Sequence, residues 1–332
     1  MTAIGVAAIV AIFAVLGLFT AVQARRIERR FPPAGELVPV EGGAIHVVEA
    51  SAQGEERGVV LLLHGASGNH ADMMAALAAP LSALGFRVVA VDRPGHGWST
   101  RFFGRRASSP AVQAELIRAA LAARGVDRAI VVGHSLAGVL SLALALQAPE
   151  FARALVLLAP VSHPWRGGVS WYYTVSAVPW LGRAFRWLVV MPAGLFALGP
   201  GVRGVFAPNV APLGYAEATG LKLVLSPRRF CANAEDVVDL KAFVVDLVGR
   251  YPSVAAPVEI VAGARDGVVS VELHSLGCSR DIPGAALTLL PGVGHSPHHA
   301  ATEEVVAAIL RAEARAAASE TRVGELRVAA AG

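Results

Sequence analysis

A serine lies at the centre of a tight turn near the middle of this 332-residue chain. The turn, Gly133-His134-Ser135-Leu136-Ala137, follows an apolar run at residues 129–132 and precedes a run at 136–147 that is typical of a helix. A strand, a sharp turn and a helix in this order hold a central serine in a strained conformation that exposes its hydroxyl. The N-terminus of the helix also favours developing negative charge. We therefore predict that Ser135 is a nucleophile.

A serine hydroxyl needs a neighbouring base at neutral pH, and two later apolar runs each lead to a residue that fits this need. Residues 258–263 are typical of a buried strand, and Asp266 comes in the turn after them. Residues 286–290 are typical of the last strand and lead into a glycine-rich loop that holds His295. A histidine there can take the serine proton, and an aspartate can fix the tautomer of that histidine. The predicted catalytic set is Ser135, Asp266 and His295.

Rival acids and bases are present near these residues. Asp281 and Glu272 are rival acids, but neither directly follows an apolar strand. His298 and His299 compete with His295, which comes first after its strand. The spacing of the three histidines could suggest a metal, yet no matching carboxylate or cysteine spacing supports one. We therefore expect neither a metal nor a cofactor.

The negative oxygen that forms when a serine attacks a carbonyl needs two backbone N–H donors. One donor is expected from Leu136, which directly follows the nucleophile. The other is expected from Ala66, in the loop at residues 64–68 that follows the apolar run 58–63. Glycines at both sides of Ala66 allow that backbone to approach a substrate. His64 is expected to be structural, and residues 92–99 are expected to form a rigid turn that supports this loop.

Five short motifs together resemble the α/β-hydrolase family over about residues 35–315. They are His64-Gly65, Asp92-Arg93-Pro94-Gly95-His96-Gly97-Trp98-Ser99, Gly133-His134-Ser135-Leu136-Ala137, Gly263-Ala264-Arg265-Asp266 and Gly294-His295. The resemblance implies an α/β fold with a mostly parallel central sheet, helices on both faces and an inserted, mainly helical cap. A serine at 135 departs from the epoxide hydrolase and haloalkane dehalogenase branches, which have aspartate there. With a serine at this position, the chain is similar to esterases, lipases, C–C bond hydrolases and cofactor-free haloperoxidases.

The N-terminal segment is apolar and uncharged from residue 3 to residue 24, long enough to span a bilayer. We expect residues 1–24 to be a transmembrane anchor and residues 25–36 to be a basic and proline-rich linker. The arginine cluster at 25–30 predicts a cytoplasmic catalytic domain by the positive-inside rule. A signal peptide normally has a positive start, which is absent here, although Val22-Gln23-Ala24 resembles a cleavage site. Export to the periplasm or secretion is therefore the alternative.

The rest of the chain divides into a core and an insertion. Strand and helix patterns alternate over residues 37–160 and 252–318, as expected for the two parts of one α/β core. The alternation stops at 161–251, which holds four of the five tryptophans, so we predict a cap there. Together with His134, the cap residues Trp171 and Tyr172 are expected to contact substrate. Residues 319–332 are expected to be a disordered tail.

Composition narrows the function further. The net charge is +4, and the arginine cluster after the apolar segment supplies most of it, so a nucleic-acid partner is not expected. Two cysteines, Cys231 and Cys278, predict neither a disulfide nor a redox compartment. We expect a membrane-anchored serine hydrolase that acts on a lipophilic carboxylic ester through an acyl-enzyme. A C–C bond hydrolase, a cofactor-free haloperoxidase and a non-catalytic ligand receptor are the alternatives, and the oligomeric state is not predicted.

Overall fold

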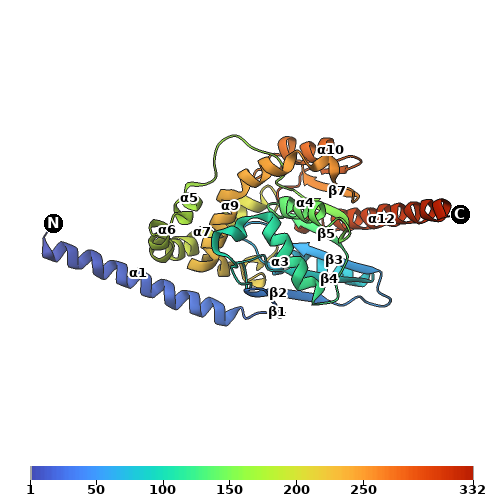
Figure 1. Cartoon of the computed structure of the whole chain (residues 1–332). Coiled ribbons are helices and arrows are strands. Elements are labelled where there is room, and N and C mark those ends of the chain that lie inside the picture. Colours follow the sequence, from blue (N-terminus) through green and yellow to red (C-terminus); the bar gives the residue numbers. More distant parts are fainter. Residues whose placement is uncertain (1, 332) are drawn as a thin grey trace.

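The computed structural model describes residues 2–331, and within them eight strands form one sheet in the order β1-β2-β4-β3-β5-β6-β7-β8 (Figure 1). Strand β2 pairs antiparallel with β1 and β4, and all other neighbours are parallel. The parallel strands are continuous apolar runs because both faces of the sheet are covered. The strand bounds are β1 Glu36–Val40, β2 Gly43–Ala50, β3 Gly58–Leu63, β4 Phe86–Val91, β5 Ala129–His134, β6 Ala152–Leu158, β7 Val258–Gly263 and β8 Ala286–Leu290.

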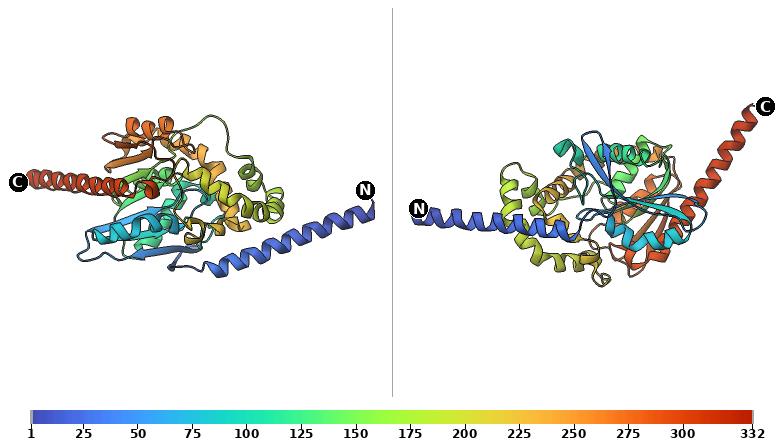
Figure 2. Two further views of the ribbon diagram at one scale, coloured as in Figure 1. Left: turned by 180° about the vertical axis from the view of Figure 1, so that it is seen from behind. Right: turned by 90° about the horizontal axis from the view of Figure 1, so that it is seen from below.

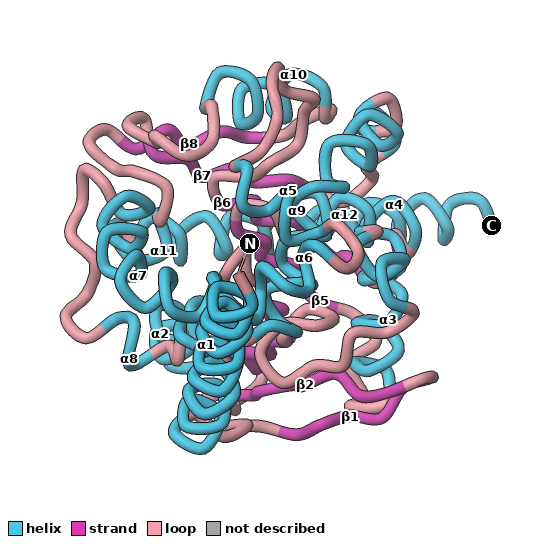
Figure 3. The backbone as a smooth tube through the Cα atoms, turned by 90° about the vertical axis from the view of Figure 1, so that its left-hand side faces the viewer, coloured by secondary structure: helices cyan, strands magenta, loops and turns pink. Residues whose placement is uncertain are grey.

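Helices cover both faces of this sheet, and Figure 3 shows α2 and α3 on opposite sides of the strands. Helices α3 (Pro110–Ala122), α4 (Ala137–Gln147) and α10 (Leu276–Asp281) enclose one hydrophobic cluster with the sheet. Helices α2 (His70–Ala83) and α12 (Thr302–Ala331) enclose the other. Short helices η1 (Gly104–Ser108), η5 (Val271–Ser275) and α11 (Pro297–Ala300) complete the connections. The predicted α/β fold, with a mostly parallel sheet and helices on both faces, is confirmed.

The C-terminal segment differs from the prediction. Residues 319–331 were expected to be disordered, but they continue helix α12, and only residue 332 lies outside the described residues. The first turns of this extension are tied to the core, because Glu320 pairs with Arg128 at 2.7 Å and with Arg153 at 3.1 Å. Alanine and glutamate are also strong helix formers, so the composition that suggested a tail extends the helix instead.

A helical insertion connects β6 to β7 and lies over the carboxyl ends of the strands, on the side that faces the viewer in Figure 3. Its longest helix, α9, packs against α5 and η1. Its second long helix, α7, is mostly apolar and directly follows the single turn η2. The bounds are α5 Trp171–Ala177, α6 Leu181–Phe185, η2 Arg186–Val190, α7 Met191–Phe206, α8 Tyr215–Ala218, η3 Leu221–Leu225, α9 Pro227–Val248 and η4 Tyr251–Ser253.

Helix α1 (Ala3–Arg30) projects away from the rest of the chain at its N-terminal end (Figure 2). Its C-terminal end contacts the insertion, where Ile27 packs with Met191, Leu223 and Leu225. Two helical stretches are long and apolar enough to cross a membrane: α1, with a mean hydropathy of 2.6, and Leu181–Phe206, with 1.5. Few residues in the most apolar part of either stretch are buried, so both are unlike the core helices of a water-soluble protein.

Candidate active site

Ser135 lies at the turn between β5 and α4, with its backbone in the left-handed region at φ 55°. A β-carbon on Gly133 would lie 2.2 Å from Ser141 Oγ and 2.6 Å from the carbonyl oxygen of Ala137, so only glycine fits two residues before the serine. The Ser135 N–H donates to the carbonyl of Leu158 at 2.9 Å, and this bond holds the strained residue against β6. The turn therefore has the geometry that the sequence predicts for a nucleophile.

The structure brings Ser135, His295 and Asp266 together from the ends of β5, β8 and β7. His295 Nε2 lies 2.9 Å from Ser135 Oγ, and His295 Nδ1 lies 2.8 Å from Asp266 Oδ2. With the aspartate as acceptor, the proton belongs on Nδ1, which leaves Nε2 free to accept the serine proton. The other carboxylate oxygen of Asp266 accepts N–H bonds from Val268 and Val269, at 2.8 and 2.9 Å. Each member of the chain is thus oriented by the next.

The rival residues lie elsewhere. Asp281 pairs with His163 at 3.0 Å, so it is not an acid for His295. His298 and His299 both point to Asp72 on helix α2, at 3.3 and 2.9 Å. Glu272 lies in η5 and has no ion pair among the residues that the structure describes. The order of strands and turns in the sequence therefore selects the same three residues as the geometry.

The two predicted backbone donors lie beside the serine. A β-carbon on Gly65 would come within 3.1 Å of Ser135 Cβ, so the loop that carries Ala66 touches the nucleophile. Leu136 directly follows Ser135 and is the N-cap residue of α4. Within residues 2–331, the N–H groups of Ala66 and Leu136 donate to no other protein group, so both stay free for a substrate oxygen. This arrangement suits a developing oxyanion.

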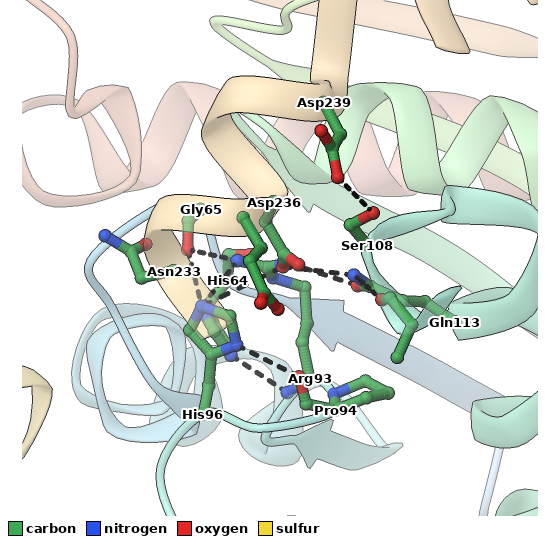
Figure 4. Close-up of polar contacts among 12 residues, drawn as sticks. His64, Gly65, Arg93, Pro94, His96, Ser108, Gln113, Asn233, Asp236 and Asp239 are labelled. Carbon is green, nitrogen blue, oxygen red and sulfur yellow. Dashed lines mark hydrogen bonds and ion pairs between the residues drawn. The ribbon is translucent and has the colours of Figure 1, made fainter. Parts of the chain in front are cut away.

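A buried polar network holds this loop in place (Figure 4). The Arg93 guanidinium donates to the carbonyls of His64 and Gly65 at 3.1 and 3.2 Å, and to Asp236 of helix α9 at 2.6 Å. Arg93 is fully buried, and Asp236 is 1% exposed. Buried ions need such partners, because an unpaired charge in the interior is costly. The network thus attaches the insertion to the loop that carries Ala66.

Helix α9 also contacts the same loop directly, since Asn233 Oδ1 accepts the N–H of Ser67 at 2.7 Å. Burial, and then the nearby Arg93 charge, lower the pKa of His64 and His96 well below the usual value. Both rings are therefore neutral, and His64 Nε2 can accept the N–H of Arg93 at 3.0 Å. The sequence predicts His64 and residues 92–99 as structural support, but it gives no sign of Asn233 or Asp236.

A cavity of about 480 Å³ opens between the loop that carries Ala66 and helix α7. The predicted substrate contacts lie on its wall: His134 is buried, while Trp171 and Tyr172 are 67% and 37% exposed at the outer side. Most of the remaining lining is apolar and comes from the insertion: Phe185, Val189, Val190, Ala193, Ala197, Leu198, Val202, Val205, Phe206, Leu221, Val224, Leu225 and Phe230. The site can therefore hold a large apolar group next to the serine.

Comparisons with known proteins agree with this geometry. A family profile described as "alpha/beta hydrolase fold" matches residues 58–186. An uncharacterised protein of Mycobacterium tuberculosis is 29% identical over 255 residues, which are 72% of this chain and 70% of the relative. The enol-lactonase from Burkholderia xenovorans has a similar structure, with a TM-score of 0.67 and 18% identity over 83% of this chain and 99% of the other.

A membrane phospholipase A, described as a bacterial virulence factor, is also similar. Its TM-score is 0.61 and its identity 23%, over 93% of this chain and 97% of the other. Likeness at this level of identity shows the fold, and the profile covers the segment from β3 through the nucleophile turn into the insertion. The profile match and these structural likenesses show that the chain has the α/β-hydrolase fold.

Proposed function

We propose that this protein is a serine hydrolase that cleaves lipophilic carboxylic esters through an acyl-enzyme. One observation carries the proposal: Ser135, His295 and Asp266 form a continuous hydrogen-bonded chain, with distances of 2.9 and 2.8 Å, beside a large apolar cavity. The family is one of hydrolases, but its fold hosts many reactions. The choice of ester therefore rests on the site and its surroundings.

The reaction follows from the positions of the atoms. His295 Nε2 takes the Ser135 proton while Oγ attacks the ester carbonyl, and the N–H groups of Ala66 and Leu136 hold the resulting oxyanion. The protonated His295 then gives its proton to the leaving alcohol, and an acyl group remains on Ser135. Water, deprotonated by His295, attacks this acyl group and releases the acid. Asp266 keeps the imidazole oriented and stabilises its positive charge.

An apolar outer surface supports a lipophilic substrate. The apolar insertion face consists of residues that are exposed by more than half: Trp171, Trp180, Leu181, Phe196, Val210 and Leu213. Tryptophan, which supplies two of these residues, suits the membrane–water interface, and leucine, phenylalanine and valine suit the apolar interior of the bilayer. The inner side of α7 lines the cavity, so a substrate that partitions into lipid has a short route to Ser135.

Helix α1 serves as the membrane anchor in this proposal. The arginines at its C-terminal end lie on the protein side, where Arg30 pairs with Glu217, and the nearby Glu28 pairs with Arg229 at 2.7 Å. The positive-inside rule then places the catalytic domain in the cytoplasm. Fusing a reporter that folds only in the periplasm to the C-terminus tests this orientation, and an active reporter would reverse it.

Covalent labelling with a fluorophosphonate probe tests the nucleophile. We expect membranes that contain the wild-type protein to be labelled, and the Ser135→Ala variant to be unlabelled. Ser279→Ala, which removes a half-buried serine of α10 that bonds to the Leu276 carbonyl, is the matched control and should be labelled like the wild type. Unlabelled wild-type protein that is folded would contradict an activated Ser135. A series of p-nitrophenyl esters of increasing acyl length then tests the preference for long chains.

A further inference from the structure

Two buried groups of one aspartate and two histidines lie in the core, and they differ in how completely their atoms are bonded. The first is Asp92 with His46 and His70. Asp92 accepts bonds from both imidazoles at 2.7 and 3.0 Å, and from the N–H groups of His70 and Trp98 at 2.8 Å each. The second ring nitrogen of His46 accepts the N–H of Gly35 at 3.0 Å. The Asp92 carboxylate is saturated by these four bonds, so it has no lone pair left to offer a cation.

The second group is Asp72 of helix α2 with His134 and His298, and it borders the cavity. One carboxylate oxygen of Asp72 is saturated by the Tyr215 hydroxyl at 2.7 Å and by His299 Nε2 at 2.9 Å. The other, Oδ2, has only a long contact of 3.3 Å with His298 Nε2. His134 Nδ1 lies 4.0 Å from the same oxygen, too far for a hydrogen bond.

The His134 ring is held so that Nδ1 faces this group as an acceptor. Its Nε2 lies 2.9 Å from the carbonyl oxygen of His295, and only a protonated nitrogen can donate there. In the neutral tautomer that carries its proton on Nε2, the other nitrogen, Nδ1, has a bare lone pair. This buried nitrogen has no hydrogen-bond partner within residues 2–331. A lone pair and a carboxylate oxygen therefore face each other, an arrangement that a cation between them would stabilise.

We propose that Asp72 Oδ2, His134 Nδ1 and His298 Nε2 bind a zinc-type divalent cation, with the fourth coordination position open to the cavity. Two imidazole nitrogens and one carboxylate oxygen suit zinc or cobalt, whereas magnesium and calcium prefer oxygen ligands. The three ligand atoms lie within 4.8 Å of one another. Zinc bonds of about 2.1 Å in a tetrahedral site place ligand atoms about 3.4 Å apart, so pairs of ligand atoms must draw together by up to about 1.4 Å. This proposal replaces the expectation, drawn from the sequence, that the protein binds no metal.

Two of the three proposed ligands, Asp72 and His134, have outer hydrogen-bond partners of the kind found around metal sites. Tyr215 and His299 orient the carboxylate through its other oxygen, as outer partners of metal ligands do. The His134 Nε2–H bond to the His295 backbone has the same role for the imidazole. A bound ion would join α2, the nucleophile turn and the segment after His295. It would thus position the backbone of the catalytic histidine without contacting the reacting atoms.

Equilibrium binding to the full-length, detergent-solubilised chain tests this site. The protein is stripped with a chelator and titrated with Zn²⁺ or Co²⁺. We expect about one ion per chain, and a Co²⁺ absorption spectrum with the intense visible bands of four-coordinate cobalt. Asp72→Asn and His298→Gln should weaken binding by on the order of 100-fold or more, because each removes a ligand, and Tyr215→Phe by about 10- to 100-fold. His70→Gln, in the saturated group, is the matched control and should bind like the wild type.

The proposal fails if the wild-type chain binds no zinc, or if Asp72→Asn and His298→Gln bind it as tightly as the wild type. If either variant does not fold, as judged by circular dichroism, the wild-type cobalt spectrum still decides, since a weak six-coordinate spectrum contradicts the ligand set. Binding and absorption are measured without a substrate. Their failure is therefore distinct from any failure of the proposed ester hydrolysis.

Discussion

The two long helices of the insertion are attached to the rest of the chain in opposite ways. Helix α9 is bound by buried polar contacts, with Asp236 between Arg93 and Arg101 at 2.6 and 2.8 Å and Asn233 on the loop that carries Ala66. Helix α7 is apolar except for Arg203 in its last turn: its inner side lines the cavity, while Phe196 on its outer side is 87% exposed. The difference indicates that α9 fixes the loop that carries Ala66, whereas the outer side of α7 is free for the lipid contact that we propose.

The largest effect is expected from breaking the attachment of α9. Asp236→Ala leaves the Arg93 and Arg101 guanidinium groups without their shared partner, and Arg93 is fully buried. Removing one member of a buried ion pair typically lowers the free energy of unfolding by about 3–5 kcal/mol. Urea unfolding followed by circular dichroism measures it. Asp246→Asn, an exposed change on the same helix, should have almost no effect, and a loss below about 1 kcal/mol in Asp236→Ala would contradict the network's role.

A charge on the outer side of α7 should separate lipid contact from catalysis. Burying a phenylalanine is worth about 1.5–3 kcal/mol, so Phe196→Asp should slow hydrolysis of a long-chain ester in vesicles about tenfold. The rate on a short, water-soluble ester should stay within about twofold, because Phe196 does not line the cavity. The matched control is Val245→Asp, which changes an exposed apolar residue of α9. An equal loss of hydrolysis rate on both esters would contradict a role of the outer side of α7 in lipid contact.

A smaller effect, on the rate of hydrolysis, is expected where α9 contacts the loop that carries Ala66. Asn233→Ala removes the acceptor of the Ser67 N–H and so loosens the backbone next to Ala66. Loss of one buried hydrogen bond costs about 1 kcal/mol, so we expect kcat to fall about three- to tenfold with little change in KM. Ser67→Ala keeps the backbone bond and removes only the hydroxyl contacts, with Asn233 at 3.0 Å and with Tyr173 at 3.2 Å, and it should therefore retain more activity. A lower kcat in Ser67→Ala than in Asn233→Ala would show that Asn233 does not act through this backbone bond.

The smallest effect is expected from pH, through the stability of the folded state. Burial and the Arg93 charge lower the pKa of His64 and His96, so the folded state binds fewer protons than the unfolded state. Stability is then fully present above about pH 6.5, the ordinary histidine value, and declines as the pH falls below it. Unfolding measured between pH 8 and pH 5 should show this decline, which must be weaker in His96→Gln. A stability that stays flat over this range would mean that neither ring has to remain neutral.

The sequence predicts the sheet and the three proposed catalytic residues because each of them directly follows an apolar strand. Ser135, Asp266 and His295 meet wherever the parallel strands β5, β7 and β8 are neighbours or near neighbours in one sheet. The contacts of the insertion could not be predicted in this way. Asp236 and Arg93 are 143 residues apart, and neither stands in a pattern that reveals the other.

The histidines after the last strand show the same limit. The sequence draws attention to His298 and His299 but gives no reason to pair them with Asp72, 226 residues before His298. Their meeting depends on where α2 and the segment after β8 lie on the sheet. The helix at 319–331 was missed for a different reason, because small and charged residues are common both in tails and in long surface helices.

Glycine and proline are frequent in helix α7, and this has a practical consequence for anyone who handles the protein. Pro200 lies inside the helix, and nothing approaches within 4 Å of the place where Gly201 or Gly204 would carry a β-carbon. Each such glycine costs about 0.5–1 kcal/mol relative to alanine, so the helix depends on its surroundings to persist. If α7 contacts lipid as we propose, we expect this segment to open before the rest of the chain once lipid is replaced by water. A protease would then cut this segment first, and its opening would limit how long the extracted protein stays folded in storage.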